Sequence, residues 1–99
     1  MNLIENHNKD IQKLCKAYKV KSLYAFGSVL TDAFNSESDV DLIVDFQLLD
    51  VLEYGDNYYN LKFSLENILK RNIDLLEEKA IKNPYFRKTI NQNKKLIYG

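Results

Sequence analysis

Hydrophobic and polar residues alternate most regularly between Val40 and Phe46. In a strand, successive side chains point to opposite faces, so this pattern predicts a strand with one apolar face and one face that carries acids. The apolar face is formed by Val40, Leu42, Val44 and Phe46, and the other face by Asp39, Asp41, Ile43 and Asp45.

Two shorter apolar runs, residues 23–26 and 72–76, predict further strands, and Gly27 ends the first of them with a turn. Apolar residues at helical spacing predict amphipathic helices over residues 3–18, 57–70 and 85–93. Gly55 weakens an earlier start of the second helix, and Asn83-Pro84 is a typical start for the third. We expect a brief helical turn over residues 31–34, a loop over 35–38 and a tail over 96–98.

The order of these elements indicates the fold class. A helix connects the second and third strands, which favours a mixed sheet. We therefore predict an α/β (α+β) fold, a small mixed β-sheet with helices packed against it, in which residues 1–99 form one domain.

Composition narrows the functional classes. Lys and Arg together number 14, as do Asp and Glu, and this zero net charge argues against a chain that wraps nucleic acid. The single cysteine, Cys15, excludes an internal disulfide and fits a reducing cytoplasm. No apolar run approaches the ~20 residues that span a bilayer. We expect a soluble, cytoplasmic protein with no membrane association.

Candidate chemistry gathers around Gly27-Ser28 and three aspartates. Asp39 and Asp41 project from one face of a strand with α-carbons roughly 6.6 Å apart, so both carboxylates can reach one metal ion. Asp74 lies in another short strand, and it would join them if the two strands are neighbours. Carboxylates are suitable ligands for Mg²⁺, and the backbone N–H groups and hydroxyl of a Gly-Ser turn can donate to phosphates.

We therefore interpret Asp39, Asp41 and Asp74 as catalytic and metal-binding residues, with Asp74 accepting the proton of an attacking hydroxyl. Gly27, Ser28 and Ser38 are the candidate residues for binding a nucleoside triphosphate, with Ser38 orienting the aspartate pair. Each motif also has a structural interpretation: Asp39 and Asp41 could be solvent-facing, Asp74 could cap a turn, and Ser28 and Ser38 could be ordinary loop residues.

Gly27-Ser28 followed after ten residues by Asp39-Val40-Asp41 resembles the signature of the nucleotidyltransferase superfamily related to DNA polymerase β. The likeness is greatest to its minimal nucleotidyltransferase (MNT) domains, and it extends from the leading helix through Asp74 to Asn83-Pro84. The resemblance implies the polymerase β-like fold. One departure is that Thr31-Asp32 stand where relatives often carry Arg-Gly, which leaves less positive charge for the phosphates.

The same resemblance implies a function. MNT domains of this kind act as antitoxins beside HEPN-type toxins, and they resemble enzymes that use Mg²⁺ and ATP to transfer AMP to a toxin tyrosine. A homo- or hetero-oligomer is compatible with this. One alternative is a weakly active or inactive nucleotide-binding module that neutralises a partner by binding. Another is an aminoglycoside-like small-molecule nucleotidyltransferase, although the chain lacks room for a second domain that builds an acceptor pocket.

Overall fold

The computed structural model describes residues 2–32 and 34–99. Its elements, in chain order, are α1 (Asn2–Asn6), α2 (Asn8–Ala17), β1 (Val20–Phe26), the 3₁₀ helix η1 (Gly27–Leu30), β2 (Val40–Phe46), α3 (Val51–Leu69), β3 (Ile73–Glu77), the 3₁₀ helix η2 (Glu78–Ala80), α4 (Pro84–Asn93) and β4 (Lys95–Tyr98).

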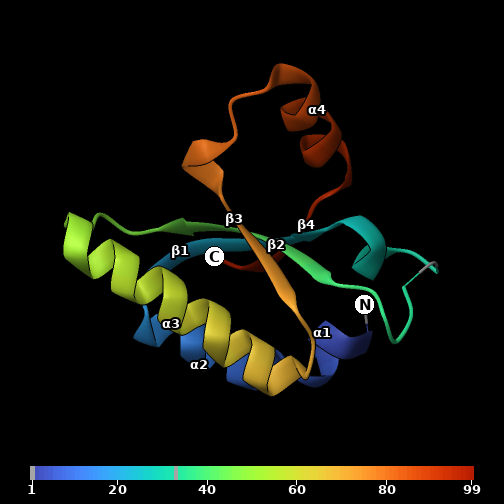
Figure 1. The fold of residues 1–99 in the computed structure, drawn as a ribbon, viewed down its shortest axis with the longest axis horizontal. Helices are drawn as coiled ribbons and strands as arrows, with labels where there is room; N and C mark the ends of the chain where they lie inside the picture. The colour runs from blue at the N-terminus through green and yellow to red at the C-terminus, as the bar shows by residue number, and fades with distance from the viewer. Residues whose placement is uncertain (1, 33) are drawn as a thin grey trace.

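The strands form one sheet in the order β3-β2-β1-β4. The neighbours β2 and β3 are parallel, whereas β1 is antiparallel to both β2 and β4. Helices α1, α2 and α3 lie on one face of this sheet and α4 lies on the other (Figure 1). The predicted mixed sheet with helices packed against it is therefore confirmed.

The main core lies between the sheet and the helices α2 and α3. Each element contributes the apolar residues that the sequence pattern assigns to its inner face, for example Leu42 of β2, Leu61 of α3 and Ile11 of α2, all of which are buried. Cys15 is fully buried there as a small apolar residue. Since β2 alternates, its acidic residues point to the opposite face, toward α4.

The helix α3 begins at Val51 rather than at residue 57. Asp50 caps it, because its side chain accepts a hydrogen bond of 2.8 Å from the backbone N–H of Glu53. Such a cap contributes about 1 kcal/mol, which offsets the cost of roughly 1 kcal/mol for Gly55 within the helix. The expected first helix is also divided, into α1 and α2, at His7.

Two further expectations were wrong in detail. The helical turn after β1 occupies Gly27–Leu30 instead of residues 31–34, of which residue 33 lies outside the described residues. The C-terminal residues form the edge strand β4 rather than a tail, since they pair with β1. Among the described helices, none combines the length and apolarity that crossing a membrane requires.

Candidate functional site

The sheet register places two of the predicted carboxylates side by side. Strands β2 and β3 run parallel with Asp41 opposite Asp74, and on the other side of Asp41 lies Phe26 at the end of β1. Paired residues of adjacent strands point to the same face, so both carboxylates face the α4 side of the sheet, away from the main core. The predicted neighbourhood of the two strands is thus observed.

The pKa of Asp41 reflects the two other aspartates near it. The pKa of Asp41 is raised by its partial burial, then by the negative charges of Asp74 and Asp39, and by a side-chain hydrogen bond with Asp74. All of these causes disfavour the ionised form. Three carboxylates therefore share one electrostatic environment, with Asp41 in the middle and Asp39 and Asp74 exposed at its sides.

These carboxylates suit a hard cation that is shared with a substrate. Within residues 2–32 and 34–99, no three His, Cys, Asp or Glu side chains are already arranged as a metal-binding group. Mg²⁺ usually binds through one or two carboxylates, several waters and the phosphates of its substrate, so a closed protein cage is not required. The all-oxygen donors at Asp39, Asp41 and Asp74 fit this ion, and its positive charge would relieve the repulsion at Asp41.

At Gly27 the backbone passes so close to Asp41 that no side chain fits between them. Its φ is +75°, and a Cβ atom at this position would lie 2.5 Å from Oδ2 of Asp41. Only glycine meets both conditions without strain. The bend between β1 and η1 therefore lies directly beside the central carboxylate, which is where the sequence predicts that phosphates bind.

The two predicted serines flank this arrangement. Ser28 lies in η1, half-buried, and its carbonyl accepts hydrogen bonds from both the backbone and the hydroxyl of Thr31. Ser38 accepts a hydrogen bond of 3.1 Å at its hydroxyl from the backbone N–H of Asn35. This contact shapes the loop that leads into Asp39, so in this structure the Ser38 hydroxyl serves the loop rather than pointing freely into the site.

Arg71 is a residue that the sequence analysis missed. Its guanidinium Nη1 donates to the carbonyls of Asn35 (2.8 Å) and Ser38 (2.6 Å), and its Cζ lies 4.5 Å from the centre of the Phe34 ring. It thereby ties the loop before Asp39 to the residues before Asp74. Its contacts join residues more than 30 positions apart, so no local pattern in the sequence points to them.

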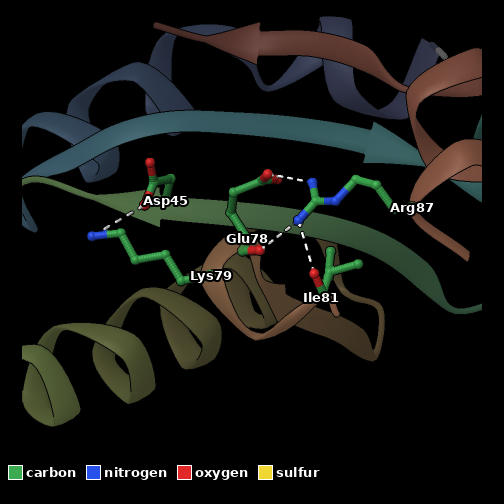
Figure 2. A network of polar contacts seen from close by, with 5 residues as sticks. All are labelled: Asp45, Glu78, Lys79, Ile81 and Arg87. Atoms are coloured by element: carbon green, nitrogen blue, oxygen red, sulfur yellow. Dashed lines mark hydrogen bonds and ion pairs between the residues drawn. The ribbon is translucent and has the colours of Figure 1, made fainter. Parts of the chain in front are cut away.

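A second polar network fastens α4 over the same face of the sheet (Figure 2). Arg87 of α4 forms an ion pair with Glu78 and donates to the carbonyls of Glu78 (2.9 Å) and Ile81 (3.1 Å). Asp45 of β2 lies 4.0 Å from Nζ of Lys79. The contacts of Arg87 therefore connect η2 and the residue after it with α4.

Comparison with known proteins identifies relatives along nearly the whole chain. The sequence model of the family described as “Polymerase beta, Nucleotidyltransferase” matches residues 9–99. A protein of Methanocaldococcus jannaschii with the name “Putative protein adenylyltransferase MJ1379” is 35% identical over 96 residues, which cover 97% of this chain and 90% of that protein.

Solved structures share the fold. A crystal structure of a toxin-antitoxin with AMP-PNP matches with a TM-score of 0.70 at 22% identity, covering 93% of this chain and 73% of that chain. A complex of a tri-AMPylated Shewanella oneidensis HEPN toxin with an MNT antitoxin matches with a TM-score of 0.65 at 20% identity, covering 96% of this chain and 71% of that chain. At such identities the likeness establishes the architecture alone.

Proposed function

The chain belongs to the polymerase beta nucleotidyltransferase family, and on that premise we propose that it transfers AMP from ATP to a hydroxyl of a partner HEPN-type toxin, with Mg²⁺, and so acts as an antitoxin. The observation that carries this proposal is the register of β2 and β3, which sets Asp41 beside Asp74, together with the Gly27 bend that contacts Asp41. Family membership supplies the reaction class, and these contacts supply the residues.

In the proposed reaction an acceptor hydroxyl attacks the α-phosphorus of ATP. The bond from that phosphorus to the oxygen that bridges it to the β-phosphorus breaks, and pyrophosphate leaves. Asp39, Asp41 and Asp74 would hold Mg²⁺, which when bound neutralises charge on the phosphates. Asp74 accepts the proton of the hydroxyl, since it is the exposed carboxylate at the β3 side of the site.

The Gly27-Ser28 bend binds the part of the triphosphate that leaves. Its close approach to Asp41 allows the backbone N–H groups of the bend to donate to phosphate oxygens while the α-phosphorus stays near the aspartates. Without the arginine that relatives often carry after Gly-Ser, this chain relies on the backbone and on the cation to balance the phosphate charge.

The choice of a protein acceptor rests on the relatives. The archaeal relative carries the name of a protein adenylyltransferase, and the structural neighbour that contains a HEPN toxin carries AMP groups on that toxin. By analogy, the acceptor proposed here is a tyrosine hydroxyl of a HEPN-type toxin that functions together with this chain. The chain matches the curated relative over 90% of that relative's length, which supports carrying over the activity of the whole protein.

The decisive experiment is transfer of label from α-³²P-ATP to the proposed HEPN-type toxin partner, in the presence of Mg²⁺. The wild-type protein should label the toxin, and Asp41→Asn should abolish labelling because it removes the central ligand. Asp45→Asn is the matched control, since it changes the same residue type on the same face of the same strand but lies beside Lys79. Equal labelling by wild type and Asp41→Asn would refute the proposal.

The same experiment separates the rival functions. An inactive binding module would form a complex with the toxin and suppress its activity without any label. A small-molecule nucleotidyltransferase would leave the toxin unlabelled and would instead modify an added aminoglycoside.

A further inference from the structure

An apolar pocket adjoins the candidate site on the side of β1. It has a volume of about 440 Å³ and lies between the Gly27 bend and α4. Its walls include the apolar residues Phe26, Leu30, Phe86 and Ile90, and the polar residues Thr89 and Asn93 also line it. A volume in the range of about 300–1,000 Å³ with apolar walls and a few polar groups is typical of a small-molecule site.

Two aromatic rings shape this pocket. Phe26 of β1 and Phe86 of α4 meet edge to face, with ring centres 6.3 Å apart and planes inclined by 71°. Phe26 is also the neighbour of Asp41 across the strands β1 and β2. The ring pair therefore connects the pocket to the carboxylates, and the 41% exposure of Phe86 leaves part of its ring open to a ligand.

The strand order indicates which reactant the pocket receives. Across the sheet, Asp74 on β3 lies beside Asp41 on β2, and Asp41 lies beside Phe26, the last residue of β1. Gly27 directly follows Phe26. In an in-line transfer the acceptor approaches the α-phosphorus from the side opposite to the pyrophosphate. With the pyrophosphate at the Gly27 bend, the acceptor arrives over β3, and the space over β1 and α4 is left for the nucleotide.

We propose that this pocket binds the planar base of the nucleotide, with Phe86 as the residue on which the base packs. The inference rests on the proposed function, because it takes the triphosphate to lie at the Gly27 bend. It goes further by assigning to Phe26 and Phe86 the part of the nucleotide affinity that depends on the base. An aromatic side chain can stack on any base. Such stacking contributes about 1–3 kcal/mol per base, or roughly 5- to 150-fold in affinity.

The test compares a ligand that carries a nucleoside on a three-phosphorus chain with a ligand that consists of the phosphate chain alone. Calorimetry with Mg²⁺ measures the dissociation constants of AMP-PNP and of inorganic tripolyphosphate for the full chain. Phe86→Ala should weaken AMP-PNP binding by about 10-fold and leave tripolyphosphate binding unchanged. Phe86→Tyr, which keeps the ring, should bind both ligands as the wild type does.

Tyr85→Ala provides the matched control. Tyr85 is the adjacent aromatic residue on α4, it is 83% exposed, and it does not line the pocket. Its removal should change neither dissociation constant. Ring-proton NMR shifts of Phe26 and Phe86 in the unmodified protein, expected with AMP-PNP and absent with tripolyphosphate, test the same inference without a substitution.

The outcomes separate the inference from the function on which it rests. Equal losses for both ligands, no loss for AMP-PNP in Phe86→Ala, or a wild type that binds the two ligands equally would overturn the base pocket while leaving a triphosphate site. A wild type that binds neither ligand would overturn the proposed function and the pocket together.

Discussion

Among single residues, Asp41 is the one on which the proposed metal binding depends most, and its environment disfavours its ionised form. Burial and the charges of Asp74 and Asp39 raise its pKa above the ordinary 3.8. The unfolded chain has no such penalty, so ionisation of Asp41 destabilises the folded state. This contribution grows as pH rises from about 3.8 through the raised pKa, and it persists at neutral pH. A bound cation would reverse it.

We predict that Asp41→Asn stabilises the metal-free protein at pH 7, with Tm rising by about 4–8 °C for each kcal/mol relieved. Near pH 3 the two proteins should differ little, because Asp41 is then protonated. Mg²⁺ with AMP-PNP should stabilise the wild type, by about 2.7 kcal/mol at a 100-fold excess over Kd, and should not stabilise the variant. Thermal melts across pH measure both effects, and a variant that is less stable than the wild type in the absence of metal would contradict the account.

Gly27 gives a second prediction at this scale. Gly27→Ala must adopt a left-handed φ at a cost of about 1–2 kcal/mol and also push the carboxylate of Asp41 aside. Stability and nucleotide binding should therefore fall together. Gly55→Ala is the matched control, since nothing lies within 4 Å of its new methyl group. Because it removes a glycine from a helix, it should stabilise the protein by roughly 0.5–1 kcal/mol and leave binding unchanged. Chemical denaturation and calorimetry distinguish the two.

Between elements, Arg71 joins the loop that precedes β2 to the start of β3. Hydrogen bonds from a charged donor contribute about 1.5–3 kcal/mol each, and here they fix Asp39 relative to Asp74. In Arg71 a single nitrogen, Nη1, donates to both carbonyls while the planar guanidinium lies over the Phe34 ring. Lysine keeps the charge but lacks this planar group.

We predict that Arg71→Ala weakens Mg²⁺–AMP-PNP binding and that Arg71→Lys restores it only in part. Lys70→Ala removes the neighbouring exposed cation and should have little effect, which separates the tether from a general loss of positive charge. Binding constants from calorimetry, read beside the stability of each variant, provide the check. If Lys70→Ala were as harmful as Arg71→Ala, the role of Arg71 would be simple charge.

The elements themselves follow from the sequence where one local signal dominates. Strict alternation gave β2 its observed bounds, and Asn83-Pro84 marks the start of α4, where Asn83 accepts hydrogen bonds from the next two backbone N–H groups. The prediction failed where a distant or competing contact decides. The cap at Asp50 outweighs Gly55 at the start of α3, and β4 exists only because the edge of β1 is available to it.

On the scale of the whole molecule, the order of the strands in the sheet brings together motifs that are far apart in the sequence. Asp41 and Asp74 are 33 residues apart in the chain, and the sequence could place them together only on the condition that their strands are neighbours. The parallel pairing of β2 and β3 meets that condition. The contacts of Arg71 with loop carbonyls, and the pocket beneath α4, depend on tertiary packing and leave no local motif, so the sequence analysis did not find them.

The central proposal is that Asp39, Asp41 and Asp74 hold a divalent cation beside the Gly27 bend. Titration of the whole protein with Mn²⁺ in place of Mg²⁺, followed by paramagnetic broadening of backbone amide signals, tests it most directly. The account predicts that signals of Gly27, Asp39, Asp41 and Asp74 broaden first, and that Asp41→Asn abolishes this while Asp45→Asn does not. Broadening centred elsewhere, or an unchanged pattern in Asp41→Asn, would contradict it.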